Sequence, residues 1–241
     1  MMRSGNPALR ADIFTGVRAT DKSQMMTVQG TVNKTSILLF IVVACALWVW
    51  NDPVKFTPFV IPALILGLII AFVTIFKKAW APITSPVYAA VEGVVLGVIS
   101  SIMERSYPGI VMQAVGLTFG TLFCLLMAYR SGLIKATENF KLGVVAATGG
   151  IALLYIASMI MGFFGARVPF IHESGPIGIG FSVFVVIIAA LNLVLDFDFI
   201  EKGAEAGAPK YMEWYGAFGL IITLIWLYLE ILRLLAKTRR R

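Results

Sequence analysis

The sequence predicts an all-α polytopic membrane protein, a bundle of seven helices. Hydrophobic residues make up 59% of the 241 residues and charged residues only 14%, whereas soluble domains carry about 25% charged residues. The mean hydropathy is +0.88. A membrane-spanning helix needs roughly 20 apolar residues, and seven runs approach or exceed this length. They are continuous rather than alternating, which excludes a β-barrel. The predicted segments are 35–50, 57–76, 87–103, 110–129, 142–166, 177–199 and 211–235.

We expect two parts in the chain. Residues 1–34 are polar and form a cytoplasmic N-terminal arm, and no small-residue cleavage site follows the first apolar run. Residues 35–241 form one transmembrane domain in the lipid bilayer, because the connections are too short for further domains. The net charge of +7 does not indicate nucleic-acid binding, since the basic residues lie at the ends of apolar segments, where they fix orientation.

The distribution of Lys and Arg predicts the orientation. The arm and the second, fourth and sixth loops hold twelve of these residues, and the first, third and fifth loops hold three. Because cytoplasmic loops are enriched in positive charge, the N-terminus is expected in the cytoplasm. Seven crossings would then leave a tail of five basic residues outside. Either this tail is an exception to the enrichment of positive charge in the cytoplasm, or the last segment enters the membrane and returns to the same side. We slightly favour a cytoplasmic C-terminus.

Five acidic residues lie within apolar segments, where a charge costs about 2.5–3.5 kcal/mol. They are Glu92, Asp196, Asp198, Glu213 and Glu230. The last three lie near segment ends, and interface or solvated positions are expected for them.

Asp196 lies one helical turn after Asn192, so both share one face and can reach a partner on another helix. Asp198 points about 200° away from Asp196. We therefore expect Asp196 to be the principal proton-titrating acid within the membrane, because burial favours a neutral carboxyl.

Glu92 is the other acid placed deep within a segment. It is flanked by Ala89, Gly93 and Gly97, which form a small-residue face that permits close helix packing. Two interpretations stay open at this point: a functional acid near a helix seam, or a protonated carboxyl that donates one structural hydrogen bond.

Other chemistry receives little support. Cys45 and Cys124 lie within spans as small hydrophobic residues, so neither a disulfide nor a metal site is predicted, and no cofactor is expected. His172 lies in a loop beside Glu173 and is expected to be solvated. An intramembrane aspartyl protease would need two carboxylates around one water. Asp196 and Asp198 cannot provide this from one helix, so an enzyme is not expected.

Four stretches resemble the Bax inhibitor-1 family of membrane proteins. Residues 195–200 read LDFDFI, residues 230–235 read EILRLL, and residues 88–97 and 113–119 are similar to the family's third and fourth helices. The resemblance covers about residues 35–241, and the order and spacing of the motifs carry it. The opening residues also look like a bacterial branch of the family, which implies a bacterial inner (plasma) membrane.

The resemblance implies a central last helix and a pH-sensitive leak of cations, notably calcium. In relatives, two aspartates on the last two helices share a proton, helped by an arginine near the end of the second helix. Asp196 matches the first aspartate, Thr223 stands at the second, and Lys77 or Lys78 stands near the arginine. Glu92, Asp198 and Glu213 are the candidates to replace the missing second acid.

Two function classes stay open. The first is a proton-modulated leak of calcium or another cation, with Asp196 as the proton-responsive group. The second is a membrane-embedded binding or regulatory protein without conduction, because relatives also associate with membrane proteins, including a membrane-bound protease in bacteria and death regulators in eukaryotes.

The predicted orientation is open to a direct test. A cysteine introduced by Ser4→Cys should escape a membrane-impermeant thiol reagent in intact cells, because the arm is expected inside. Labelling should appear once the membrane is permeabilised, and strong labelling of intact cells would overturn this orientation.

Overall fold

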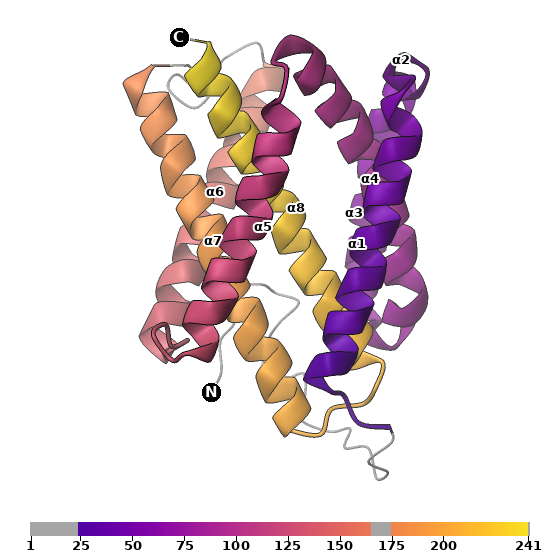
Figure 1. Ribbon diagram of the computed structural model, residues 1–241, viewed down its shortest axis with the longest axis vertical. Coiled ribbons are helices and arrows are strands. Elements are labelled where there is room, and N and C mark those ends of the chain that lie inside the picture. The colour runs from indigo at the N-terminus through magenta and orange to yellow at the C-terminus, as the bar shows by residue number, and fades with distance from the viewer. Residues whose placement is uncertain (1–23, 165–174, 241) are drawn as a thin grey trace. The chain divides into compact units, whose positions relative to one another are not determined.

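The computed structural model describes residues 24–164 and 175–240, and within them it contains only helices, connections and one isolated β-bridge between Met25 and Pro209. Figure 1 shows the course of the chain. The helices are α1 (Val28–Trp50), α2 (Pro53–Phe56), η4 (Thr57–Phe59), α3 (Val60–Phe76), η5 (Lys78–Trp80), α4 (Ala81–Ser106), α5 (Ile110–Arg130), α6 (Glu138–Phe163), α7 (Pro176–Glu205) and α8 (Met212–Arg239). Seven spans in the described ranges are long and apolar enough to cross a membrane, so the chain is an integral membrane protein.

The helices extend beyond the predicted segments. α1 begins at Val28, so residues 28–34 of the expected arm are helical, with the Thr27 side chain capping the first turn. α4 begins at Ala81, has Pro82 in its first turn, where a missing N–H is tolerated, and continues through Pro86. The length of the apolar runs did not predict these helix ends, because polar residues can continue a helix through backbone hydrogen bonds. Residues 1–23 and 165–174, including His172, lie outside the described residues.

The chain divides into two compact units. Unit 1 contains α5, α6, α7 as far as Phe197, and α8 from Thr223 onwards. Unit 2 contains α1 to α4, the end of α7 from Asp198, and α8 as far as Ile222. α7 and α8 therefore supply residues to both units.

In unit 2, α1 and α4 pack with their backbones in close contact. A Cβ on Gly93 would lie 2.6 Å from the carbonyl oxygen of Val42, and one on Gly97 would lie 2.7 Å from that of Ala46. The small-residue face predicted around Glu92 thus exists, and it faces α1. Helices surrounded by lipid gain little from the hydrophobic effect when they associate, so close van der Waals packing of this kind drives their association.

Unit 1 has an apolar core between α6, α7 and α8. Ile151, Val185 and Ile188 are buried at its centre, and Trp226 packs against them. A polar contact continues the same helix interface, since the Asn192 side-chain amide donates to the Thr148 hydroxyl at 2.8 Å.

α8 is one continuous helix and the most buried of the seven described spans, as expected for a central last helix. The alternative of a last segment that enters and returns is therefore wrong. The cytoplasmic location of the C-terminus stays a prediction. The basic end is also less solvated than predicted: Lys237 is 5% exposed and donates to the Gly178 carbonyl and to the Ser182 hydroxyl.

The α1–α4 contact generates a prediction. Gly97→Ala should lower the free energy of unfolding by roughly 1–3 kcal/mol, the usual cost of overpacking, because its Cβ meets the backbone of Ala46 rather than a movable side chain. Gly116→Ala is the matched control, since a Cβ there meets no atom within 4 Å. Unfolding of both variants in mixed detergent micelles measures the difference, and equal stability would contradict the close packing.

Candidate functional site

Asp196 is a deeply buried acid of unit 1. It lies on α7 and is 2% exposed. Its partner is Thr223 of α8, itself 4% exposed, with which it forms a side-chain hydrogen bond. The Oδ2 atom of Asp196 has no hydrogen-bond partner among the described residues. The structure therefore brings together the two positions that the family resemblance pairs, with a threonine in place of the second acid.

The chemistry of this pair follows from its partners. A hydroxyl offers one hydrogen bond, whereas an ionised carboxylate accepts several. In the described part of the chain no Lys, Arg or His forms an ion pair with Asp196. An ionised carboxylate would thus be poorly compensated. The carboxyl can take up a proton or contact a cation through Oδ2, and no second carboxylate among the described residues shares a proton with it.

Asp198 points elsewhere, as its spacing from Asp196 predicts. It belongs to unit 2 and forms an ion pair of 2.8 Å with Lys202, one turn further along α7. α7 continues to Glu205, so Asp198 lies within the helix rather than close to its end. A salt-bridged, partly exposed carboxylate of this kind is a conventional helix-surface pair.

Glu92 is half-buried on α4 in unit 2. Its carboxyl is hydrogen-bonded to the Tyr88 hydroxyl, one turn earlier on the same helix. It also lies against α3, because a Cβ added to Gly67 would be 2.9 Å from Glu92 Oε1. Glu92 thus lies at the contact of α4 with α3, whereas its small-residue neighbours Gly93 and Gly97 pack against α1.

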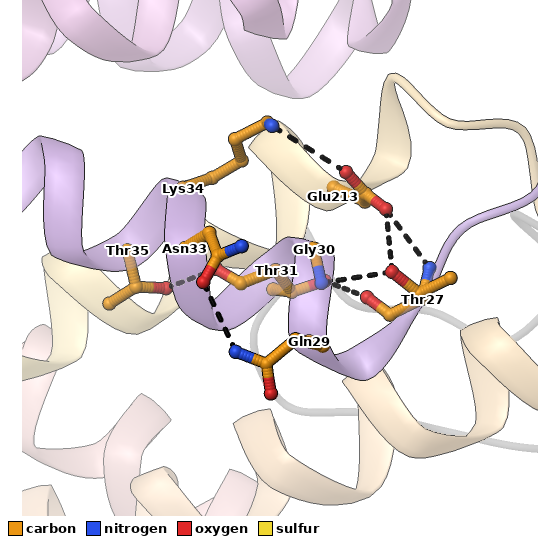
Figure 2. Close-up of polar contacts among 8 residues, drawn as sticks. All are labelled: Thr27, Gln29, Gly30, Thr31, Asn33, Lys34, Thr35 and Glu213. Carbon is orange, nitrogen blue, oxygen red and sulfur yellow. Dashed lines mark hydrogen bonds and ion pairs between the residues drawn. The ribbon is translucent and has the colours of Figure 1, made fainter.

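Glu213 is far more buried than predicted. We expected it at the membrane interface, but it is 1% exposed and lies at the start of α8 against the start of α1. Figure 2 shows its carboxylate between Lys34 and Thr27. The Thr27 backbone N–H and hydroxyl donate to Oε1 at 3.1 and 2.9 Å, and the Lys34 ammonium is 3.8 Å from Oε2.

We call this group, Thr27, Gly30, Lys34 and Glu213, the N-terminal clasp. The carboxylate lies where a Cβ of Gly30 would be, so the glycine makes room for it. The Lys34 ammonium also lies over the Trp214 ring, 5.5 Å from its centroid. Backbone hydrogen bonds extend the contact, from Met26 N–H to the Ala208 carbonyl and from Lys210 N–H to the Gln24 carbonyl. The first described residues are thereby fixed to the α7–α8 connection.

The two candidate helper cations belong to unit 2, whereas Asp196 belongs to unit 1. Lys77 caps the C-terminus of α3 and is exposed. The Lys78 ammonium lies 6.0 Å from the ring centroid of Tyr215 on α8. Neither lysine is in the unit that contains Asp196.

A second polar cluster in unit 1 was not predicted. Glu230 is 2% exposed, contrary to the interface position expected for it. It accepts from the Tyr155 hydroxyl at 2.9 Å and from Arg233 at 3.0 Å. Arg233 also donates to the Tyr155 hydroxyl and covers its ring. The i,i+3 spacing of Glu230 and Arg233 was a usable signal, but nothing local pointed to Tyr155.

The N-terminal clasp generates a prediction. Gly30→Ala should cost roughly 1–3 kcal/mol of stability through overpacking, because the new Cβ would occupy the space of the Glu213 carboxylate. The cost should shrink when Glu213→Ala removes that carboxylate, so a double-mutant cycle followed by unfolding in mixed micelles should show strong coupling. Gly143→Ala, whose Cβ would meet nothing within 4 Å, serves as control. Additive effects of Gly30→Ala and Glu213→Ala would contradict the described contact.

Comparison with known proteins identifies the family of the chain. A family model described as Bax inhibitor 1 like matches residues 6–240. The search of curated proteins found no match. The matched region includes all seven spans and the contact between Asp196 and Thr223. Because the match covers nearly the whole sequence, the chain belongs to the Bax inhibitor 1-like family.

Proposed function

We propose that the protein is a proton-modulated cation leak of a bacterial inner membrane, with its N-terminus in the cytoplasm and calcium as the first ion to test. The observation that supports this is Asp196, a buried acid whose Oδ2 has no partner among the described residues. Ionisable groups inside the membrane are costly and usually serve ion or proton pathways. Asp196 is the proton-responsive group of this proposal.

The partner of Asp196 sets the expected form of the pH response. Two adjacent carboxyls cannot both ionise easily, and their titrations are coupled. Thr223 cannot ionise, so Asp196 titrates without that coupling. Gating should therefore be less sharply dependent on pH than in a protein with two acids at these positions.

The threonine at position 223 favours a second candidate function. Without an acid pair, the protein would act as a membrane-embedded binding or regulatory protein of other membrane proteins, such as a membrane protease, without conducting ions. Purified protein in liposomes separates the two candidates, because only the first gives calcium flux at any pH.

The leak makes a specific prediction for two neighbouring acids. In liposomes loaded with a calcium indicator, Asp196→Asn should nearly abolish the difference in flux between mildly acidic and mildly alkaline pH. Asp198→Asn should leave that difference almost intact, because Asp198 is paired with Lys202. Equal effects of the two variants would exclude Asp196 as the responsive group.

Thr223→Asp tests the contact from the other side. The variant places a second carboxyl against Asp196, and the shared proton should make the flux depend more steeply on pH than in the parent. Thr223→Asn is the matched control, since it has a similar size and cannot ionise. If the aspartate variant folds and titrates like the parent and the asparagine variant, Asp196 and Thr223 do not act together.

A further inference from the structure

Glu92 occupies the middle of a membrane span. The span that contains α4 runs over 29 residues, Lys78–Ser106, with 14 residues on either side of Glu92. At 1.5 Å of rise per residue, each end of the helix is roughly 21 Å away. The carboxyl is therefore as far from either aqueous phase as this helix allows.

The carboxyl packs against other helices of unit 2. Ser85, Tyr88 and Glu92 recur at helical spacing on one face of α4. Ser85 donates to the Trp214 carbonyl and the Tyr88 ring contacts the Phe218 ring, both on α8. Ile83, on the opposite face, is 73% exposed. Glu92 itself is half-buried.

The surroundings of Glu92 do not suit a negative charge. α3 carries no titratable side chain and presents Gly67 to the carboxyl. Among the titratable groups of the helices packed around α4, Lys34 of α1 is paired with Glu213. Cys45 of α1 lies by Gly93, and Tyr215 of α8 lies under Lys78. In the described ranges, the polar partner of Glu92 is the Tyr88 hydroxyl alone.

Glu213 provides an internal contrast within the same unit. Its carboxylate receives a backbone N–H, a hydroxyl and a nearby ammonium, which is the set of partners that compensates a buried charge. Glu92 has one hydroxyl, at the centre of a span where an uncompensated charge is costly. The two glutamates are thus in opposite environments.

We propose that Glu92 is a proton-binding site at the centre of the membrane, occupied at neutral pH and separate from Asp196. The bound proton makes Glu92 a neutral carboxylic acid that fits against Gly67 and Tyr88. Loss of the proton puts an uncompensated charge on the α3–α4 seam. This site does not rest on the proposed leak, because it concerns a different residue and requires no ion flow.

Infrared spectroscopy of the full-length protein in liposomes at neutral pH tests the site. Glu92→Gln should remove the carbonyl band of one protonated carboxylic acid. The matched control Glu213→Gln should remove carboxylate bands instead. Loss of carboxylate bands from Glu92→Gln would overturn the proposal, whatever the flux measurements show.

Chemical labelling of the unaltered protein tests the same site without relying on correct folding of the Glu92→Gln variant. N,N′-dicyclohexylcarbodiimide is apolar and reacts with protonated carboxyls. The carboxyl proton goes to a carbodiimide nitrogen, the carboxyl oxygen adds to the central carbon, and acyl transfer to nitrogen gives a stable N-acylurea. No group leaves, so the peptide gains the whole mass of the reagent. Mass spectrometry should find this mass on Glu92, less of it as the pH rises, and none on Glu213. An unlabelled Glu92 would refute the site.

Discussion

Each polar group that a span carries into hydrocarbon must find its partner within the protein, and the packing of this chain depends on that constraint. Lys237 is satisfied by a carbonyl and a hydroxyl of α7. Glu230 is satisfied by Tyr155 and Arg233. In both cases a helix of unit 1 is held at a fixed rotation about its axis, because turning it would separate a costly group from its partner on the neighbouring helix.

The same constraint fixes the register of α7 and α8 in unit 1. Ser182 contacts Lys237 and Asp196 contacts Thr223, so the helices run antiparallel. The two contacts are 14 residues apart on each helix. Four helical turns span about 14 residues, so both contacts lie on one face of each helix. Asp196 is therefore held opposite Thr223 by an unrelated contact four turns away.

Most of the fold was predictable from composition because each span must be continuously apolar. The contact of Gly93 and Gly97 with α1 was also predictable in kind, since small residues at helical spacing can only serve close packing. The rotation of Asp196 away from Asp198 followed from helix geometry alone.

The burial of Glu213 and Glu230 was not predictable, and the reason is physical. Distance from a segment end indicates depth along a helix but not which side chains cover it. Glu213 is covered by Thr27, 186 positions away in the chain, and Glu230 by Tyr155, 75 positions away. A single sequence contains no signal of such pairings. The Lys77 and Lys78 assignments came from the family pattern, and the structure places the Lys78 ammonium over the Tyr215 ring.

The N-terminal clasp has a consequence for the order in which the protein is assembled. The first turn of α1 is completed by a carboxylate of α8, the last helix to be synthesised. During translation α1 therefore enters the membrane with Thr27 and Lys34 lacking Glu213, and with Gly30 facing an empty space. The first helix reaches its final state only after the last one arrives. Formation of the N-terminal clasp is thus a late step of biogenesis, and it joins the start of α1 to the start of α8 within unit 2.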